Sequence, residues 1–208
     1  MPHGTPSFNR MSLFCETTGE RKYLNRSERK RFYEAVALLP DLKDQTFVLM
    51  IYWTGCRPSE ALGLSAMNID LDDAMVIIRS LKKRDHLKSR HFRMAPVPRE
   101  FVAFLDAVHG ISAAQHRGDG GASVALWNFS RTTGWRRVRQ VMQEAEISGA
   151  KCSAKGLRHS FGVLAALNGI PQSRIQYWLG HSNLETTAIY IDLAIAEDRQ
   201  LARQMWIH

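Results

Sequence analysis

The segment DQTFVLMIYWTG, residues 44–55, constrains the fold most, because it contains an unbroken run of apolar side chains, FVLMIYW, two helical turns long. A helix that is apolar on all sides has no face suited to water, so other elements must surround it. The run is also shorter than the ~18 apolar residues that a membrane span requires. We therefore expect a central helix that is buried in a globular core and ends at Gly55.

Helical periodicity recurs on both sides of this central segment. NRSERKRFYEAVALLP predicts a helix with Ser27 as its N-cap and an apolar face of Phe32, Ala35, Val36 and Leu39. PREFVAFLDAVHG predicts another helix, and GISAAQHRGDGGAS predicts a Gly-rich loop after it. From Gly156 onward the pattern is helical, with breaks at 169–171 and 180–182.

The helix TGWRRVRQVMQEAEI is amphipathic. Its core face is expected to hold Trp135, Val138, Val141 and Met142, with the arginines between them facing outward.

Three short segments in the middle of the chain change the period from helical to alternating. SAMNIDLDD, AMVIIRS and HFRMAPVP are β-branched or alternating and are separated by polar turns, which predicts a small antiparallel sheet. The expected fold is therefore mostly α (α+β): a helical bundle with a three-stranded antiparallel sheet. We expect an irregular N-terminal arm over residues 1–22 and one domain over residues 23–208.

The charge balance favours a polyanionic partner. Lysine and arginine number 28 against 20 acidic residues, which gives a formal charge of +8. Nucleic acid is the most frequent partner of so basic a chain, although an anionic membrane or solubility alone would also fit. The N-terminus has no apolar core typical of a signal peptide, and the odd number of three cysteines favours reduced thiols in a cytoplasm.

Two basic motifs lie near the predicted sheet. TGCRPSEALGL places Arg57 at the start of a short helix, where free N–H groups and a guanidinium both suit a phosphate, and Glu60 can orient Arg57 or cap the helix. The turn SLKKRDHLKSRHFR could deliver one ammonium group as a proton donor or neutralise a phosphate; its basic residues are Lys82, Lys83, Arg84, Lys88, Arg90 and Arg93. Taken singly, the first motif would be a surface ion pair and the second a solvated charged turn.

The C-terminal helices hold the remaining chemistry. Lys155 precedes Arg158 by one helical turn, whereas His159 points about 100° away from Arg158, so that only one of the two is expected to face a given site. His181 follows a glycine and precedes Tyr190 by nine residues. A lone histidine after a glycine is more often a helix cap, and a lone tyrosine on a helix is more often part of the core.

In combination and in this order, TGCRPSEALGL, the LKKR turn, LRHSFGVLAALNG and IQYWLGHSNLETTAIY resemble the tyrosine recombinases, the phage integrase family. The similarity covers roughly residues 22–195 and implies the catalytic domain of that family. It implies a site-specific recombinase or integrase that cuts and rejoins double-stranded DNA through a 3′-phosphotyrosyl intermediate. No cofactor or metal is implied.

The resemblance also assigns roles to six residues. Arg57 and Arg158 would clamp the scissile phosphate, His181 would donate a further hydrogen bond, and Tyr190 would attack. Lys82 would protonate the leaving 5′ oxygen, with Lys83 as the alternative. Lys155 stands where the family usually has histidine, and a charged ammonium can donate to phosphate but cannot accept the tyrosine proton.

The resemblance implies a homotetramer on paired DNA sites that is weakly associating or monomeric without DNA, in a prokaryotic cytoplasm and associated with the nucleoid when bound to DNA. Only about 22 residues precede the similar region, too few for the N-terminal helical domain of larger members. The chain thus resembles the short recombinases, including those that invert promoter segments; a sequence cut from a longer protein is the other reading. A type IB topoisomerase-like relaxing enzyme and a non-catalytic DNA-binding regulator are the alternative functions.

Overall fold

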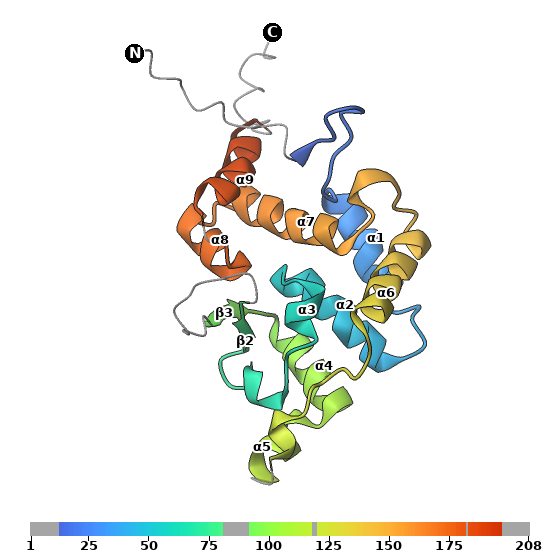
Figure 1. Cartoon of the computed structure of the whole chain (residues 1–208), viewed down its shortest axis with the longest axis vertical. Helices are drawn as coiled ribbons and strands as arrows, with labels where there is room; N and C mark the ends of the chain where they lie inside the picture. Colours follow the sequence, from blue (N-terminus) through green and yellow to red (C-terminus); the bar gives the residue numbers. More distant parts are fainter. Residues whose placement is uncertain (1–12, 81–91, 118–119, 182, 197–208) are drawn as a thin grey trace.

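The computed structural model describes residues 13–80, 92–117, 120–181 and 183–196. Its helices and strands surround one central helix, α2 (Figure 1). In chain order the principal elements are α1 (Arg26–Val36), α2 (Leu42–Thr54), α3 (Pro58–Ala61), β1 (Ile69–Asp70), β2 (Met75–Arg79), β3 (Phe92–Pro96), α4 (Arg99–His109), α5 (Ile111–Arg117), α6 (Arg131–Glu144), α7 (Ala154–Leu167), α8 (Gln172–Leu179) and α9 (Glu185–Ala196). The mostly helical fold predicted from the sequence is confirmed.

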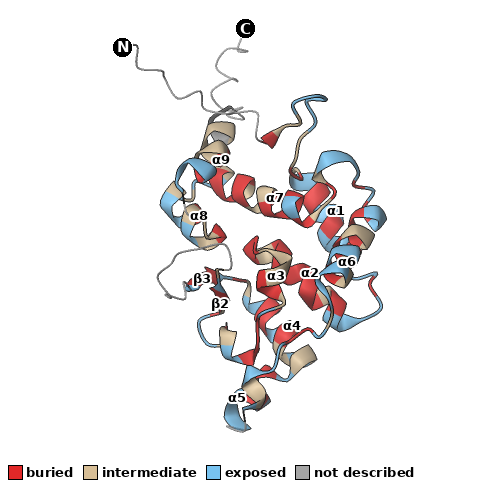
Figure 2. Ribbon diagram, in the orientation of Figure 1, coloured by how far each residue is buried: buried red, intermediate tan, exposed pale blue. Residues whose placement is uncertain are grey.

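Helix α2 is buried over most of its length after an exposed first turn, as its composition predicts. Phe47, Val48, Met50 and Ile51 are fully buried, and the helix contacts α1, α4, α6 and α7 (Figure 2). It ends at Gly55, which adopts left-handed backbone angles with φ +61°. A Cβ at Gly55 would lie 2.8 Å from the side chain of Leu179, so both the conformation and the space favour glycine.

The small sheet has the order β1-β2-β3, with both pairs antiparallel. Val76 pairs with Ala95 and Ile78 pairs with Arg93, and these four side chains face the protein interior. The three-stranded antiparallel sheet is therefore confirmed, although β1 contains only two residues.

The buried apolar residues form two clusters. The larger core is built from the α2 surroundings and the sheet, whereas the smaller core lies among α7, α8 and α9. Leu13 and Tyr23, from the segment before α1, also pack in the smaller core. Within the part of the chain that the structure describes, no helix is long and apolar enough to cross a membrane.

Two local predictions about helix ends and loops were wrong. Helix α1 is capped by Asn25, whose side chain accepts from the N–H of Glu28 in a capping box, and not by Ser27. The predicted loop after α4 contains α5, because Ile111 and Ala114 bury apolar surface there. Two of the expected loop positions thus belong to the core.

Helix α6 turns a different face to the core than predicted. Val138, Val141 and Met142 are buried, but Trp135 is 49% exposed and has the guanidinium of Arg139 over its ring. Gly134, the residue before it, faces the core and packs against the ring of Phe47. The aromatic ring therefore lies on the surface.

Candidate active site

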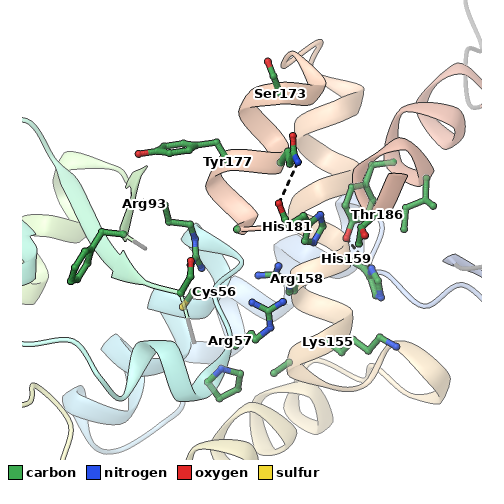
Figure 3. A pocket seen from close by; sticks show the side chains of 18 residues that line it. Cys56, Arg57, Arg93, Lys155, Arg158, His159, Ser173, Tyr177, His181 and Thr186 are labelled. Carbon is green, nitrogen blue, oxygen red and sulfur yellow. Dashed lines mark hydrogen bonds between the residues drawn. The ribbon is translucent and has the colours of Figure 1, made fainter. Parts of the chain in front are cut away.

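A cavity of about 800 Å³ lies between the α3–β3 side of the molecule and α7–α9 (Figure 3). It collects polar side chains that are far apart in the sequence. The ionisable side chains among them are Cys56, Arg57, Arg93, Lys155, Arg158, His159, Tyr177, His181 and Tyr190. Five of the six residues expected to form a site therefore border one cavity; the sixth, Lys82, and its alternative Lys83 lie outside the described residues.

Arg57 is held at the start of α3 by Glu60. The Glu60 carboxylate accepts from the Arg57 backbone N–H at 2.9 Å and from its guanidinium at 3.0 Å. Pro58 begins the helix at the position where a missing N–H is tolerated best. Glu60 thus both orients Arg57 and caps the helix, as the sequence allows, and leaves part of the guanidinium exposed to the cavity.

Arg93 lies behind Arg57 and is only 2% exposed. It forms an ion pair with Glu60 at 2.7 Å, and donates to Ser80 and to the Trp178 carbonyl. The expectation that this arginine belongs to a solvated charged turn was wrong. Burial alone would raise the pKa of the Glu60 carboxyl group and favour its neutral form. Arg93 and Arg57 outweigh burial, so the pKa is lowered and Glu60 stays ionised.

Arg158 joins the ends of two helices. Its guanidinium donates to the carbonyl of Gly55 at 2.7 Å and to that of Leu179 at 2.6 Å, after α2 and at the end of α8. Burial and the nearby charge of Arg57 lower its pKa to about 10, so that it stays protonated at neutral pH. The two arginines are thus close enough to act on one anion.

Tyr190 lies on α9 with its ring 1% exposed. The ring packs against Gly162 of α7, where a Cβ would come within 2.5 Å of it, and stacks on the His181 imidazole with centroids 6.1 Å apart. Burial raises the pKa of the phenol to about 12, although Arg158 and Arg57 oppose that shift. The hydroxyl is therefore neutral at ordinary pH and must lose its proton to become a strong nucleophile.

His159 is the residue that the sequence reasoning left out. Its Nδ1 lies 3.1 Å from the Tyr190 hydroxyl in a hydrogen bond, and it borders the same cavity as Arg158. The expectation that only one of these neighbours could face the site was wrong, because both side chains line the same cavity (Figure 3). Burial and the charges of Lys155 and Arg158 lower the His159 pKa to about 4.

His181 and Lys155 border the cavity from opposite sides. The Nδ1 atom of His181 is hydrogen-bonded to Thr187 at 2.9 Å, which fixes the ring beside Tyr190. Lys155 is exposed in the first turn of α7. Cys56 also reaches the cavity, but burial raises its pKa to about 11 and keeps the thiol protonated.

The arrangement is suited to an anion that reacts with an oxygen nucleophile. Three guanidinium groups and one ammonium group line a cavity that is also bordered by two phenols and two imidazoles. Preorganised donors of this kind stabilise the charge that develops on a phosphorane. Within the described ranges, no group of three or more His, Cys, Asp or Glu side chains is placed to hold a metal ion.

Residues 22–197 match the sequence model of the phage integrase family. The chain belongs to this family. The resemblance inferred from the motifs is confirmed, and the helical domain with its small sheet is the fold of the family's catalytic domains.

Known relatives of this phage integrase family chain include tyrosine recombinase XerD of Mycobacterium tuberculosis (strain ATCC 25618 / H37Rv), 31% identical over 171 residues. That match covers 79% of this chain and 51% of the relative. The chain spans about half the length of the XerD relatives it matches.

Two solved structures resemble the fold closely. The crystal structure of XerA recombinase has a TM-score of 0.66 at 26% identity, over 89% of this chain and 65% of that one. XerH site-specific recombinase, bound to its difH substrate in a pre-cleavage complex, has a TM-score of 0.67 at 20% identity, over 90% and 53% of the two chains.

Proposed function

We propose that the protein is a site-specific DNA recombinase that cuts and rejoins DNA through a 3′-phosphotyrosyl intermediate. The observation that carries the proposal is the meeting of Arg57, Arg158, His181 and Tyr190 at one cavity, in a chain of the phage integrase family. Its named relatives are recombinases, which supports the same class of reaction here.

In the proposed reaction, Arg57 and Arg158 hold the non-bridging oxygens of the scissile phosphate. Arg57 presents its guanidinium from the N-terminus of α3, and Arg158 is fixed by the carbonyls of Gly55 and Leu179. His181 and Lys155 supply further donors. A planar fork matches two phosphate oxygens better than a point charge does.

The Tyr190 oxygen then forms a bond to phosphorus as the bond to the 5′ oxygen breaks. Lys82 is proposed to protonate that leaving oxygen, with Lys83 as the alternative; both lie outside the described residues. The phosphotyrosyl bond conserves the energy of the phosphodiester, so a 5′ hydroxyl from a second strand can reverse the step without a nucleotide cofactor.

We propose double-stranded DNA as the partner, with residues 23–208 as the catalytic domain and residues 1–22 as an arm. The formal charge of +8 and the DNA-bound state of the XerH relative support this partner. Assembly as a homotetramer on paired sites, weak association without DNA and binding to the nucleoid complete the proposal.

Covalent trapping tests the reaction without knowledge of the target sequence. The probe is a library of duplexes with about 30 random base pairs and a central nick, from which the short cleaved fragment diffuses away. Wild-type protein should retain DNA after denaturation in a buffer containing EDTA, and sequencing the retained duplexes identifies the preferred site. Tyr190→Phe should bind those duplexes but retain none, because only the hydroxyl is removed.

The same duplexes separate the recombinase from the alternatives. A recombinase joins ends from two different duplexes, whereas a relaxing enzyme of the type IB class only removes supercoils from a plasmid carrying the site. A DNA-binding regulator gives no adduct at all. An adduct that persists in the Tyr190→Phe variant would show that another residue is the nucleophile.

A further inference from the structure

The hydrogen bond between His159 and Tyr190 places a neutral imidazole directly on the hydroxyl that is proposed to react. The Nδ1 atom lies 3.1 Å from the phenol oxygen, and the two rings approach edge to face with centroids 6.0 Å apart. The other ring nitrogen, Nε2, is buried and has no hydrogen-bond partner among the described residues. Among the described residues, Tyr190 is thus the one hydrogen-bond partner that the structure gives the His159 ring.

A base for the phenol is missing from the residues assigned so far. Lys155 is a cation and cannot accept a proton while charged. The Nδ1 atom of His181 is already engaged with Thr187, and its ring stacks on the face of the Tyr190 ring. A stacked ring of this kind is poorly aligned to take a proton from the hydroxyl, which lies in the plane of the phenol.

We propose that His159 is a further catalytic residue, which holds the Tyr190 hydroxyl and accepts its proton as the phenol oxygen attacks phosphorus. This inference rests on the proposed recombinase function. It requires the tautomer with its proton on Nε2, so that the Nδ1 lone pair faces the phenol.

The proposed step balances in both directions. As the bond from Tyr190 to phosphorus forms, the phenol proton moves to His159 Nδ1, and the 5′ oxygen leaves with a proton from the hairpin lysine. In the rejoining step, the incoming 5′ hydroxyl attacks phosphorus and gives its proton to the hairpin lysine, which became neutral in the first step. The imidazolium of His159 then returns its proton to the departing tyrosine oxygen, so the enzyme ends as it began.

The charges around His159 explain why it is available as a base. Lys155 and Arg158 on α7 and Lys22 before α1 all disfavour its protonated form, and burial has the largest effect, which together lower its pKa to about 4. The imidazole is therefore neutral at physiological pH. A scissile phosphate bound between Arg57 and Arg158 offsets these cations, so the imidazolium becomes accessible when the substrate is in place.

Two substitutions of His159 distinguish its role as hydrogen-bond partner of the Tyr190 hydroxyl from its role as acceptor of the hydroxyl proton. In His159→Asn, the amide oxygen can occupy the place of Nδ1 and accept the hydrogen bond, but it is not basic. His159→Phe removes both properties and keeps a ring. Single-turnover cleavage of the nicked duplex recovered by trapping should fall about 10²-fold in both variants, the usual size of a general-base contribution.

The dependence of cleavage on pH identifies the reason for the loss. From about pH 6 to about pH 9, the wild-type rate should change little, because neutral His159 is already the dominant form. Without a base the phenol must ionise in solvent, so the rate of His159→Asn should rise about tenfold per pH unit. Lys155→Gln should be slower but keep the wild-type pH profile. A merely structural role of His159 would lower the rate without changing the slope.

A more acidic phenol provides a second measurement. Replacement of Tyr190 by a fluorinated tyrosine should raise the cleavage rate of His159→Asn much more than it changes the rate of the wild type, because a more acidic phenol needs less help from a base. Nitrogen NMR of histidine-labelled wild-type protein without DNA should find His159 neutral and protonated on Nε2 at pH 6. Protonation on Nδ1 in that spectrum would overturn the proposal.

The outcomes distinguish this inference from the proposed function. Failure of the wild type to form any adduct contradicts the recombinase itself. An adduct formed by the wild type and, at the same rate and with the same pH profile, by His159→Asn contradicts only the role of His159. Acquisition of the steep profile by Lys155→Gln would assign the base to Lys155. Circular dichroism and binding to the same duplex control for folding of each variant.

Discussion

Arg93 and Glu60 form an ion pair, 2.7 Å between Nη2 and Oε2, in which both side chains are almost completely buried. The pair fixes the carboxylate that holds Arg57, so a buried ion pair determines where a cation of the cavity lies. It also joins β3 to α3, which are far apart in the sequence.

Removal of the Glu60 charge should destabilise the whole domain. Glu60→Gln leaves the guanidinium of Arg93 buried without an anion, for which we expect a loss of about 3–5 kcal/mol in the free energy of unfolding. Urea denaturation measures this loss. The matched control is Glu34→Gln, because the Lys30–Glu34 pair is exposed and should contribute no more than ~0.5 kcal/mol. Equal effects of the two substitutions would contradict the importance of the buried pair.

Stability should fall as the pH is lowered from 7 to 5. Burial lowers the pKa of both His109 and His159 to about 4, below the value of about 6.5 in an unfolded chain. The unfolded state therefore binds more protons between these values, and stability is lost as pH falls through this window. Glu60, whose pKa is lowered, remains ionised there and does not contribute.

The urea midpoint at several pH values measures this dependence. His109→Gln keeps a polar group near Thr46 but cannot be protonated, so it should reduce the dependence. His116→Gln changes an exposed histidine and should leave the slope unaltered. A slope that is identical in all three proteins would argue against burial of neutral His109.

Arg158→Lys should impair both cleavage and structure, because an ammonium group cannot bridge the two carbonyls that the guanidinium joins. We expect single-turnover cleavage to fall by 10²-fold or more, in line with the ~3 kcal/mol lost with one preorganised donor. Arg136→Lys, at an exposed position of α6, is the control for the change in residue type. Cleavage within threefold of wild type in Arg158→Lys would count against the guanidinium clamp.

Gly162→Ala should displace the Tyr190 ring but leave its hydroxyl group unchanged. The added methyl group would meet the Tyr190 ring at 2.5–2.7 Å, and overpacking of this kind costs about 1–3 kcal/mol. Adduct formation should decline while DNA binding is retained. Gly63→Ala is the matched control, since its methyl group would only reach ordinary contact at 3.5 Å. Normal adduct yield from Gly162→Ala would show that Tyr190 reacts from another position.

Sequence patterns could predict the elements whose burial is decided locally. The apolar run of α2, the face of α1 with Phe32, and the glycine breaks before α8 and α9 all carry their own signal. The order of Arg57, Arg158 and Tyr190 identified a family, and with it the residues that share one cavity.

The errors concern contacts made by distant parts of the chain. Arg93 looks like one more charge in a basic turn until Glu60, 33 residues away, is brought beside it. Trp135 lies on the surface, whereas its neighbour Gly134 faces Phe47 in the core. His159 was set aside by a rule about the angle between neighbouring side chains on a helix, but His159 and Arg158 both line the cavity, which the other elements around it define.

The division of the apolar residues into two clusters has a consequence for control of the reaction. Tyr190 belongs to the smaller cluster, whereas α2 and the sheet belong to the larger one. Small cooperative units open more often than large ones, so α9 should exchange its amide hydrogens sooner than α2. Undocking of α9 would then remove Tyr190 from the cavity while the rest of the domain stays folded. Undocking a few apolar side chains requires less free energy than unfolding the domain. In the proposed recombinase, reversible docking of α9 could therefore prevent DNA cleavage until the protein is assembled on its site.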